Sequence, residues 1–203
     1  MPSKTFLNLP EAKKQKIMDA ALHEFSVRPV EHAKVSNIIK ETGISRGAFY
    51  KYFTDITDLY QYFYDSIKLD AHQKLYDALT STNGDIFAAL DYFFEHLLEY
   101  FDSTKYKQYF KVMILGMNSF TEEKYMPGFS GGHQVQEHFK RMLNLETLKI
   151  DSDEEFTLFL AFLTDMMHDL LKRHFMEDHT VAETLQAYRM RSHWLQDGVK
   201  KRG

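Results

Sequence analysis

Apolar residues recur every three or four positions along almost the whole of this chain, and few residues interrupt that pattern. Only 4 prolines and 9 glycines occur among the 203 residues. No stretch combines alternating apolar and polar residues with the Val, Ile and Thr content that is typical of strands. Spacing of three and four places side chains on one face of an α-helix, whereas a strand requires spacing of two. The sequence therefore predicts an all-α protein with about nine helices.

Local start signals divide this pattern into separate helices. The N-cap residues that the sequence predicts are Ser45, Asp55, Asp85, Ser152 and Thr180. The last two are each followed by glutamate three residues later, which is the spacing of a capping box. Glycines and a proline in residues 119–132 predict a loop. The expected helices cover residues 10–26, 34–41, 45–52, 55–79, 86–101, 103–118 and 135–145, followed by two helices that begin at residues 152 and 180.

The charged residues are distributed unevenly along the chain. Residues 1–53 contain nine lysines and arginines against five acidic residues, although the whole chain has a net charge of -4. The remaining residues must therefore be strongly acidic. A basic N-terminal part on an acidic body predicts that only the N-terminal part binds a polyanion such as DNA.

Several classes of function are disfavoured by what the sequence lacks. It contains no cysteine, which excludes disulfides, thiolate zinc sites and thiol nucleophiles. It has no G-x-S-x-G, no phosphate-binding glycine loop and no H-E-x-x-H, so we expect neither an enzyme nor a cofactor. No apolar run approaches the length of a membrane span, and the first residues do not begin a secretory signal. We therefore expect a cytoplasmic protein.

Residues 35–53 have the spacing of a helix-turn-helix. Val35, Ile38 and Ile39 predict the buried face of one short helix, and Gly43 supplies the turn. Phe49 would pack a second short helix across the first, which leaves the opposite face of that second helix exposed. Arginine on such a face can donate two hydrogen bonds to guanine, while lysine, tyrosine and helix amides suit phosphates. The outward face is expected to carry Ser45, Arg46, Ala48, Tyr50 and Lys51, and Gly47 is expected to join them in binding DNA.

This segment resembles the TetR family of bacterial transcriptional regulators, whose pattern is roughly I-A-x-x-x-G-[VI]-S-x-G-x-[LF]-Y-x-[HY]-F-x-[SD]-K-x-x-L. The matching residues here are Ile38, Gly43, Ile44, Ser45, Gly47, Phe49, Tyr50, Tyr52, Phe53, Asp55 and Leu59, with Ile17, Asp19, Ala20, Ala21 and Phe25 upstream. The chain departs from the pattern at Ile39 and Ile56, and Pro29 and Ala33 replace the usual Gly and Thr before the first short helix. We therefore expect no side-chain N-cap of the usual kind there, and phosphate contacts from Lys34 or Ser36 instead.

The resemblance implies a division into two domains. Residues 1–54 would form a three-helix DNA-binding head, and residues 55–203 a helical body that binds a small effector and forms a homodimer. The dimer would bind a palindromic operator in double-stranded DNA and act as a repressor that the effector releases. The helix that begins at Asp55 would connect the two parts and transmit the switch.

Within the body, aromatic and methionine residues are expected to line a pocket for an apolar or planar effector. The expected lining is Tyr92, Phe93, His96, Tyr100, Phe110, Met113, Met117 and Met166. The segment Thr121–Gly132 is expected to be either a lid or a simple connector. The last two helices are apolar over more than one stripe, which favours a dimer surface. The expected dimer residues are Phe159, Leu163, Met167, Leu170, Leu185, Tyr188, Trp194 and Leu195.

Two alternatives stay open at this point. His174, Glu177, Asp178 and His179 could cluster at one helix end and bind zinc or nickel, although such residues at a helix terminus are more often solvated. The chain could also be a helical interaction module that has lost specific DNA binding, for which Ile39 and Ile56 are the best support.

Overall fold

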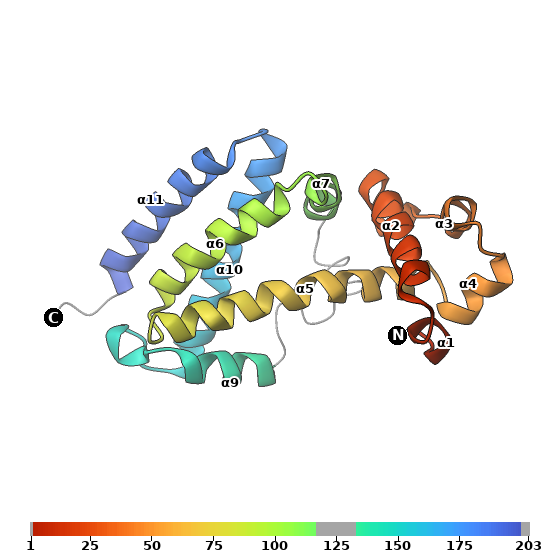
Figure 1. The fold of residues 1–203 in the computed structure, drawn as a ribbon. Coiled ribbons are helices and arrows are strands. Elements are labelled where there is room, and N and C mark those ends of the chain that lie inside the picture. Colours follow the sequence, from red (N-terminus) through yellow and green to blue (C-terminus); the bar gives the residue numbers. More distant parts are fainter. Residues whose placement is uncertain (1, 117–132, 200–203) are drawn as a thin grey trace. The chain divides into compact units, whose positions relative to one another are not determined.

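The computed structural model describes residues 2–116 and 133–199, and these residues form helices without any strand (Figure 1). Nine of the described helices have seven residues or more, which confirms the all-α prediction. None of the helices in the described ranges is both long and apolar enough to cross a membrane. The α-helices are α1 Lys4–Leu7, α2 Glu11–Val27, α3 Val35–Thr42, α4 Arg46–Tyr52, α5 Ile56–Ser81, α6 Ile86–Phe101, α7 Lys107–Gly116, α9 His133–Met142, α10 Asp153–Met176 and α11 Val181–Val199, with short 3₁₀ helices at Val30–His32 and Leu145–Thr147.

Contacts between Cα atoms group the chain into two compact units. The first unit contains α1–α4, the beginning of α5 to Asp70, and α7. The second contains the remainder of α5 from Ala71, together with α6, α9, α10 and α11. The functional division at residue 54 remains a prediction.

The first unit is built around α2, which packs against both α3 and α7. Ile17, Ala21 and Phe25 of α2 are almost completely buried. Phe25 meets the ring of Tyr60 from α5 edge-on, with 4.9 Å between the ring centroids. Aromatic side chains therefore form much of this core, and such contacts add to the stabilisation from burial alone.

The sequence did not predict α1, a single turn near the N-terminus. The turn is too short for helical periodicity, and an isolated turn of this length is unstable in water. Its apolar anchor, Phe6, is fully buried and lies against Phe53 with 4.6 Å between ring centroids. Contacts that are distant in sequence, rather than local propensity, therefore explain why this helix forms.

In the second unit, α11 packs against both α6 and α10. The ring of Tyr188 stacks at a tilt on Phe94 of α6, with centroids 4.6 Å apart. Burial, and then the nearby Asp91, raise the pKa of Tyr188 well above its ordinary value. Tyr188 is therefore a core residue of this unit.

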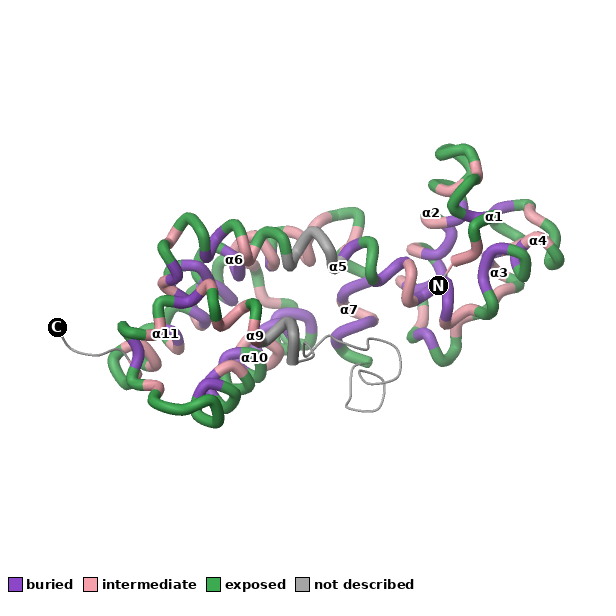
Figure 2. Tube along the Cα trace, turned by 90° about the horizontal axis from the view of Figure 1, so that it is seen from below, coloured by how far each residue is buried: buried purple, intermediate pink, exposed green. Residues whose placement is uncertain are grey.

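Figure 2 shows buried and exposed positions following one another along α10 and α11, as expected for helices with one face in a core.

A surface ion pair also connects α10 to α11. Asp169 accepts a hydrogen bond of 2.7 Å from Arg191 and further bonds from Arg173. Partial burial alone would raise the pKa of Asp169, but the hydrogen bonds from the two arginines outweigh burial and lower that pKa.

The predicted capping signals are present at the helix starts. Asp85 accepts from the backbone N–H groups of Phe87 and Ala88. Thr180 and Glu183 form a reciprocal capping box, in which each side chain accepts from the other residue's backbone N–H.

The turn between α5 and α6 lies against the segment that follows α9. Gly84 has φ +79°, and a Cβ built there would lie 2.6 Å from both Asn144 N and Met142 O. Asn144 also donates its backbone N–H to Gly84 O, at 3.0 Å. Any other residue at this position would strain the backbone and collide with a neighbouring main chain.

Candidate nucleic-acid interface

The turn between α3 and α4 has the geometry that the sequence predicted. Gly43 adopts a left-handed conformation with φ 73°, and its N–H donates to Ile39 O, which ends α3. The Ser45 side chain then accepts from Ala48 N at 3.1 Å and begins α4. Thr42 is buried and donates its hydroxyl to Ile38 O. The short connection therefore fixes α4 across α3 as a helix-turn-helix.

One face of α4 is buried and the opposite face is exposed. Phe49 and Tyr52 pack into the core of the first unit. Of the six residues of this segment predicted to bind DNA, five are exposed and the sixth is half-buried. In chain order they are Ser45, Arg46, Gly47, Ala48, Tyr50 and Lys51, of which Ala48 is the half-buried one.

Arg46 and Tyr50 contact each other on this exposed face. The guanidinium lies 5.6 Å from the centroid of the tyrosine ring, and Nη2 is 3.4 Å from the hydroxyl oxygen. The two residues are one helical turn apart, which is the spacing at which helix side chains meet. The contact holds the guanidinium of Arg46 and the phenol hydroxyl of Tyr50 beside each other at the surface.

The internal packing of the protein gives no reason for glycine at position 47. A Cβ built on Gly47 would meet no atom of the described residues within 4 Å. In the interior of a helix, glycine lowers stability relative to alanine by about 0.5–1 kcal/mol, and Gly47 is the second residue of α4. Open space at this position leaves room for a partner to approach the helix backbone closely.

The N-terminus of α3 is capped by a residue from another helix. The Lys34 side chain makes no cap hydrogen bond. Instead, the buried carboxylate of Glu24 on α2 accepts from the Lys34 backbone N–H at 2.7 Å and from the Asn37 side chain at 2.9 Å. Arg28 also donates to this carboxylate, at 3.2 Å. Glu24 therefore replaces the side-chain cap whose absence the sequence predicted.

We did not identify Glu24 from the sequence, although the sequence contained a signal for it. Glu24 lies three and four residues after Ala21 and Ala20, so helical spacing places it on the same buried face. A carboxylate on an apolar helix face needs donors, because an unpaired buried charge is costly. The exposed residues Lys34 and Ser36 remain the predicted phosphate contacts at this end of α3.

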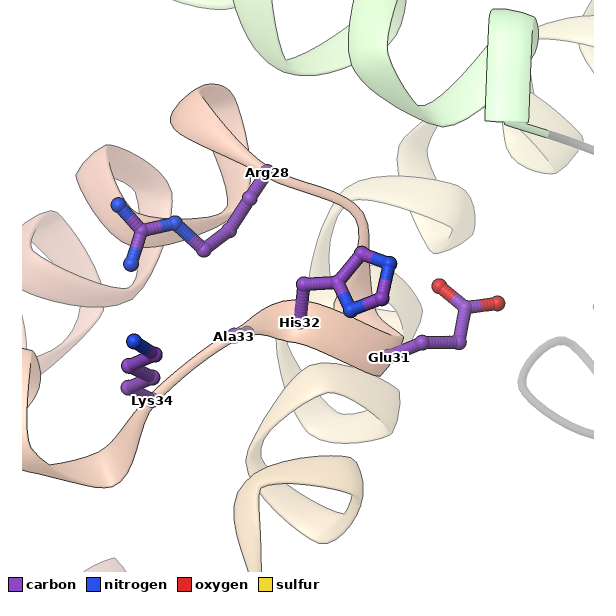
Figure 3. A pocket seen from close by; sticks show the side chains of 5 residues that line it. All are labelled: Arg28, Glu31, His32, Ala33 and Lys34. Carbon is purple, nitrogen blue, oxygen red and sulfur yellow. The ribbon is translucent and has the colours of Figure 1, made fainter.

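A hollow of about 550 Å³ opens beside the same helix end, lined by Arg28, Glu31, His32, Ala33 and Lys34. Figure 3 shows the side chains of Arg28 and Lys34 on one side of the hollow, away from those of Glu31 and His32. Two cationic side chains therefore lie near the N-terminus of α3, where the helix dipole also favours anions.

The structure distributes the predicted effector residues over both units. Phe110 and Met113 are buried on α7 in the first unit, whereas Phe93 and Met166 are buried in the second. Tyr92 is about half exposed and stacks on the half-buried His96, with ring centroids 4.0 Å apart. Tyr92 therefore contributes to the surface of α6 rather than to an interior lining, which corrects our expectation. Tyr100 is half-buried, while Met117 and the segment Thr121–Gly132 lie outside the described residues.

The expected dimer residues also need correction. Five of them are already buried within one chain and so present almost no surface to a second copy, namely Phe159, Leu163, Leu170, Leu185 and Tyr188. Met167 and Leu195 are half-buried, and Trp194 is 66% exposed. The same two helices expose three further large apolar side chains, which are Leu158 at 64%, Phe162 at 55% and Met190 at 50%.

The two histidines at the end of α10 that the sequence offered as metal ligands have different partners in the structure. His174 is buried, with Nδ1 2.9 Å from Thr184 Oγ1 and Nε2 3.3 Å from Asp102 Oδ1. His179 instead lies beside Glu177 at 3.2 Å. Across residues 2–116 and 133–199, no three His or acidic side chains are grouped to hold a metal ion.

Two family models match the sequence over most of its length. Residues 17–63 match the model described as bacterial regulatory proteins of the tetR family, and residues 85–199 match the tetracyclin repressor-like C-terminal domain. No curated protein matches the sequence.

Solved structures with the same fold come from several bacteria. A TetR family transcriptional regulator from Chloroflexus aurantiacus is 22% identical, with full coverage of both chains and a TM-score of 0.57. SmeT, the repressor of the Stenotrophomonas maltophilia multidrug efflux pump SmeDEF, is 16% identical over 98% of this chain and 94% of its own, with a TM-score of 0.70. A TetR-family regulator from Pectobacterium atrosepticum is also 16% identical, over 93% of this chain and 94% of its own, with a TM-score of 0.56.

Proposed function

Because the chain belongs to the TetR family of bacterial transcriptional regulators, we propose that it represses transcription as a homodimer that binds a palindromic operator. A small effector would bind the helical body and release the protein from DNA. The observation that carries this proposal is the exposed face of α4, on which Arg46, Gly47, Tyr50 and Lys51 are all accessible. This face has the charge and the small residues that a helix needs to enter the major groove.

Each exposed residue has a role that follows from its chemistry. Arg46 leaves Tyr50 and donates two hydrogen bonds to a guanine edge. Tyr50 and Lys51 bind phosphates, as do Lys34 and Ser36 at the N-terminal end of α3. Phosphate contacts set the register of the protein on the duplex, and Arg46 supplies base preference.

Selection from random duplex DNA tests this proposal. The wild-type protein should enrich a palindrome, since a two-fold dimer presents two copies of α4 to related half-sites. Arg46→Ala should lower affinity for the enriched duplex by about 1–3 kcal/mol and relax base preference, whereas Lys51→Ala should weaken all sequences alike. Affinity should also fall steeply with salt, because phosphate binding releases counterions.

The opposite results would count against the proposal. Unchanged affinity in Arg46→Ala would mean that another face reads DNA. Weak binding to every duplex at every salt concentration would instead favour a helical module that has lost specific DNA recognition.

We place the dimer surface on the exposed sides of α10 and α11. The exposed apolar residues Leu158 and Phe162 lie one turn apart on α10, and Met190 and Trp194 lie one turn apart on α11. Large apolar side chains at this spacing on two helices that pack together are typical of an association surface. Sedimentation at micromolar concentration should therefore detect a particle of twice 24.0 kDa.

Repression and release by an effector are supported by the match of residues 85–199 to a tetracyclin repressor-like C-terminal domain and by the fold shared with SmeT, a repressor. We propose an apolar or aromatic effector that contacts Phe93 and Met166 in the second unit. Release then follows from linkage, since an effector that weakens DNA binding must be weakened by DNA to the same extent. Screening small molecules for release of the selected duplex tests this step.

A further inference from the structure

The recognition helix α4 is short, and its C-terminal end needs hydrogen-bond donors from elsewhere. An α-helix leaves its last four carbonyl groups without partners inside the helix. In a helix of seven residues these carbonyls make up more than half of the backbone acceptors. Phe49 O accepts from Phe53 N, so the remaining carbonyls at this end depend on other donors.

Ser3 supplies two of these donors from the N-terminal end of the chain. Its backbone N–H donates to Tyr52 O at 2.9 Å, and its hydroxyl donates to Lys51 O at 2.7 Å. The same hydroxyl oxygen accepts from Phe6 N at 3.3 Å and so begins α1. One serine therefore caps the beginning of α1 and the end of α4 together.

Aromatic packing holds α1 in this position. The Phe6 ring lies 6.0 Å from Tyr52, 4.6 Å from Phe53 and 5.4 Å from Tyr62, measured between ring centroids. Phe6 is fully buried, although it belongs to a helix of only four residues. The contact is specific, because it joins α1 to the last residue of α4 and to the residue that follows it.

We propose that Ser3 and Phe6 are positioning residues for DNA recognition, which act by fixing the C-terminal end of α4. Lys51 and Tyr50 occupy this end, so its orientation decides where the proposed phosphate contacts fall. Both positioning residues lie outside residues 17–63, the part that matches the family's DNA-binding model. The inference rests on the proposed function of α4, but the contact itself can be tested without DNA.

Hydrogen exchange of the intact protein tests the contact. Ser3→Ala removes the hydroxyl donor to Lys51 O and should raise exchange of the amides in α4 by about three- to tenfold, the equivalent of one net hydrogen bond. Exchange in α10 and α11 should not change, which separates a local effect from global destabilisation. Ser3→Thr keeps the hydroxyl and should retain wild-type exchange. Equal exchange of α4 in wild type and Ser3→Ala would overturn the proposal.

DNA binding tests the functional consequence on the duplex enriched by the wild-type protein. Ser3→Ala should lower affinity for this duplex about three- to tenfold. The slope of log affinity against log salt concentration should not change, because no charge is lost. Phe6→Leu should act in the same direction, since it keeps an apolar side chain but loses the aromatic contacts. Ser152→Ala is the matched control, because it removes a serine cap from α10, in the other unit, and should leave affinity unchanged.

The outcomes separate this proposal from the proposed function. If Ser3→Ala raised amide hydrogen exchange in α4 without lowering affinity for DNA, the positioning role would be overturned. The proposed DNA-binding function would not be affected by that result. Failure of the wild-type protein to bind any duplex would refute the proposed function, and the exchange comparison would still decide whether Ser3 holds α4.

Discussion

Replacing Gly47 by alanine should change stability and DNA binding in opposite directions. A Cβ at this position meets no atom within 4 Å in the part of the chain that the structure describes, so the methyl group fits there without strain. Alanine should then raise the free energy of unfolding by at most about 0.5–1 kcal/mol, the difference in a helix interior, because Gly47 is the second residue of α4. If α4 enters the groove with this face, the same methyl group lies between the helix and DNA. By analogy with an overpacked contact, the cost to binding is about 1–3 kcal/mol, or roughly five- to 150-fold in affinity.

Thermal unfolding and titration of the selected duplex measure the two effects separately. Gly198→Ala is the matched control, because Gly198 is an exposed helical glycine in α11 whose added Cβ would also meet nothing within 4 Å. That variant should not lose DNA affinity. A Gly47→Ala protein with unchanged or tighter DNA binding would refute the reasoning, since it would show that no close partner faces this position.

Three further perturbations have outcomes that the structure determines. Glu24→Gln replaces one carboxylate oxygen by an NH2 group, which cannot accept the hydrogen bond that the oxygen accepted. The free energy of unfolding in urea should therefore fall by about 1.5–3 kcal/mol. Unchanged stability would exclude Glu24 as the cap at Lys34. Asp169→Asn should cost about 0.5–1 kcal/mol at pH 7, because the bond from Arg191 is partly exposed. The lowered pKa of Asp169 means that this stability difference is fully present above about pH 5 and is lost as pH falls through that pKa, whereas a difference that does not change with pH would contradict the ion pair. Trp194→Lys should weaken dimerisation at least tenfold in sedimentation without loss of helicity, and a dimer of wild-type strength would place the interface elsewhere.

The features that the sequence predicted well are those that depend on near neighbours. Ser45 caps a helix through a contact three residues away, and Asp85 does so through contacts two and three residues away. Gly43 ends α3 because its own backbone adopts a conformation that few other residues tolerate. These local rules also position the exposed face of α4, so most of the candidate interface could be read from residue types and spacing.

The features that the sequence did not reveal depend on contacts between distant segments. The cap on α3 comes from Glu24, ten residues before Lys34, and α1 exists because Phe6 meets rings near residue 53. The spacing of apolar residues showed that they occupy more than one face of α10. It did not show which of these faces packs against the core. Phe159 and Phe162 are one turn apart, yet the first is buried and the second is exposed. Only the packing of neighbouring helices distinguishes them.

The close approach at Gly84 joins the turn after α5 to the segment at the end of α9 through their main chains. Backbone atoms of residues 142–144 lie so near this glycine that not even one methyl group fits between them. The C-terminal end of α5 therefore cannot slide along its own axis without taking the segment after α9 with it. Because main-chain atoms make this contact, a change of side-chain rotamer cannot relieve it, and the hydrogen bond from Asn144 to Gly84 ties the end of α5 to residues 142–144.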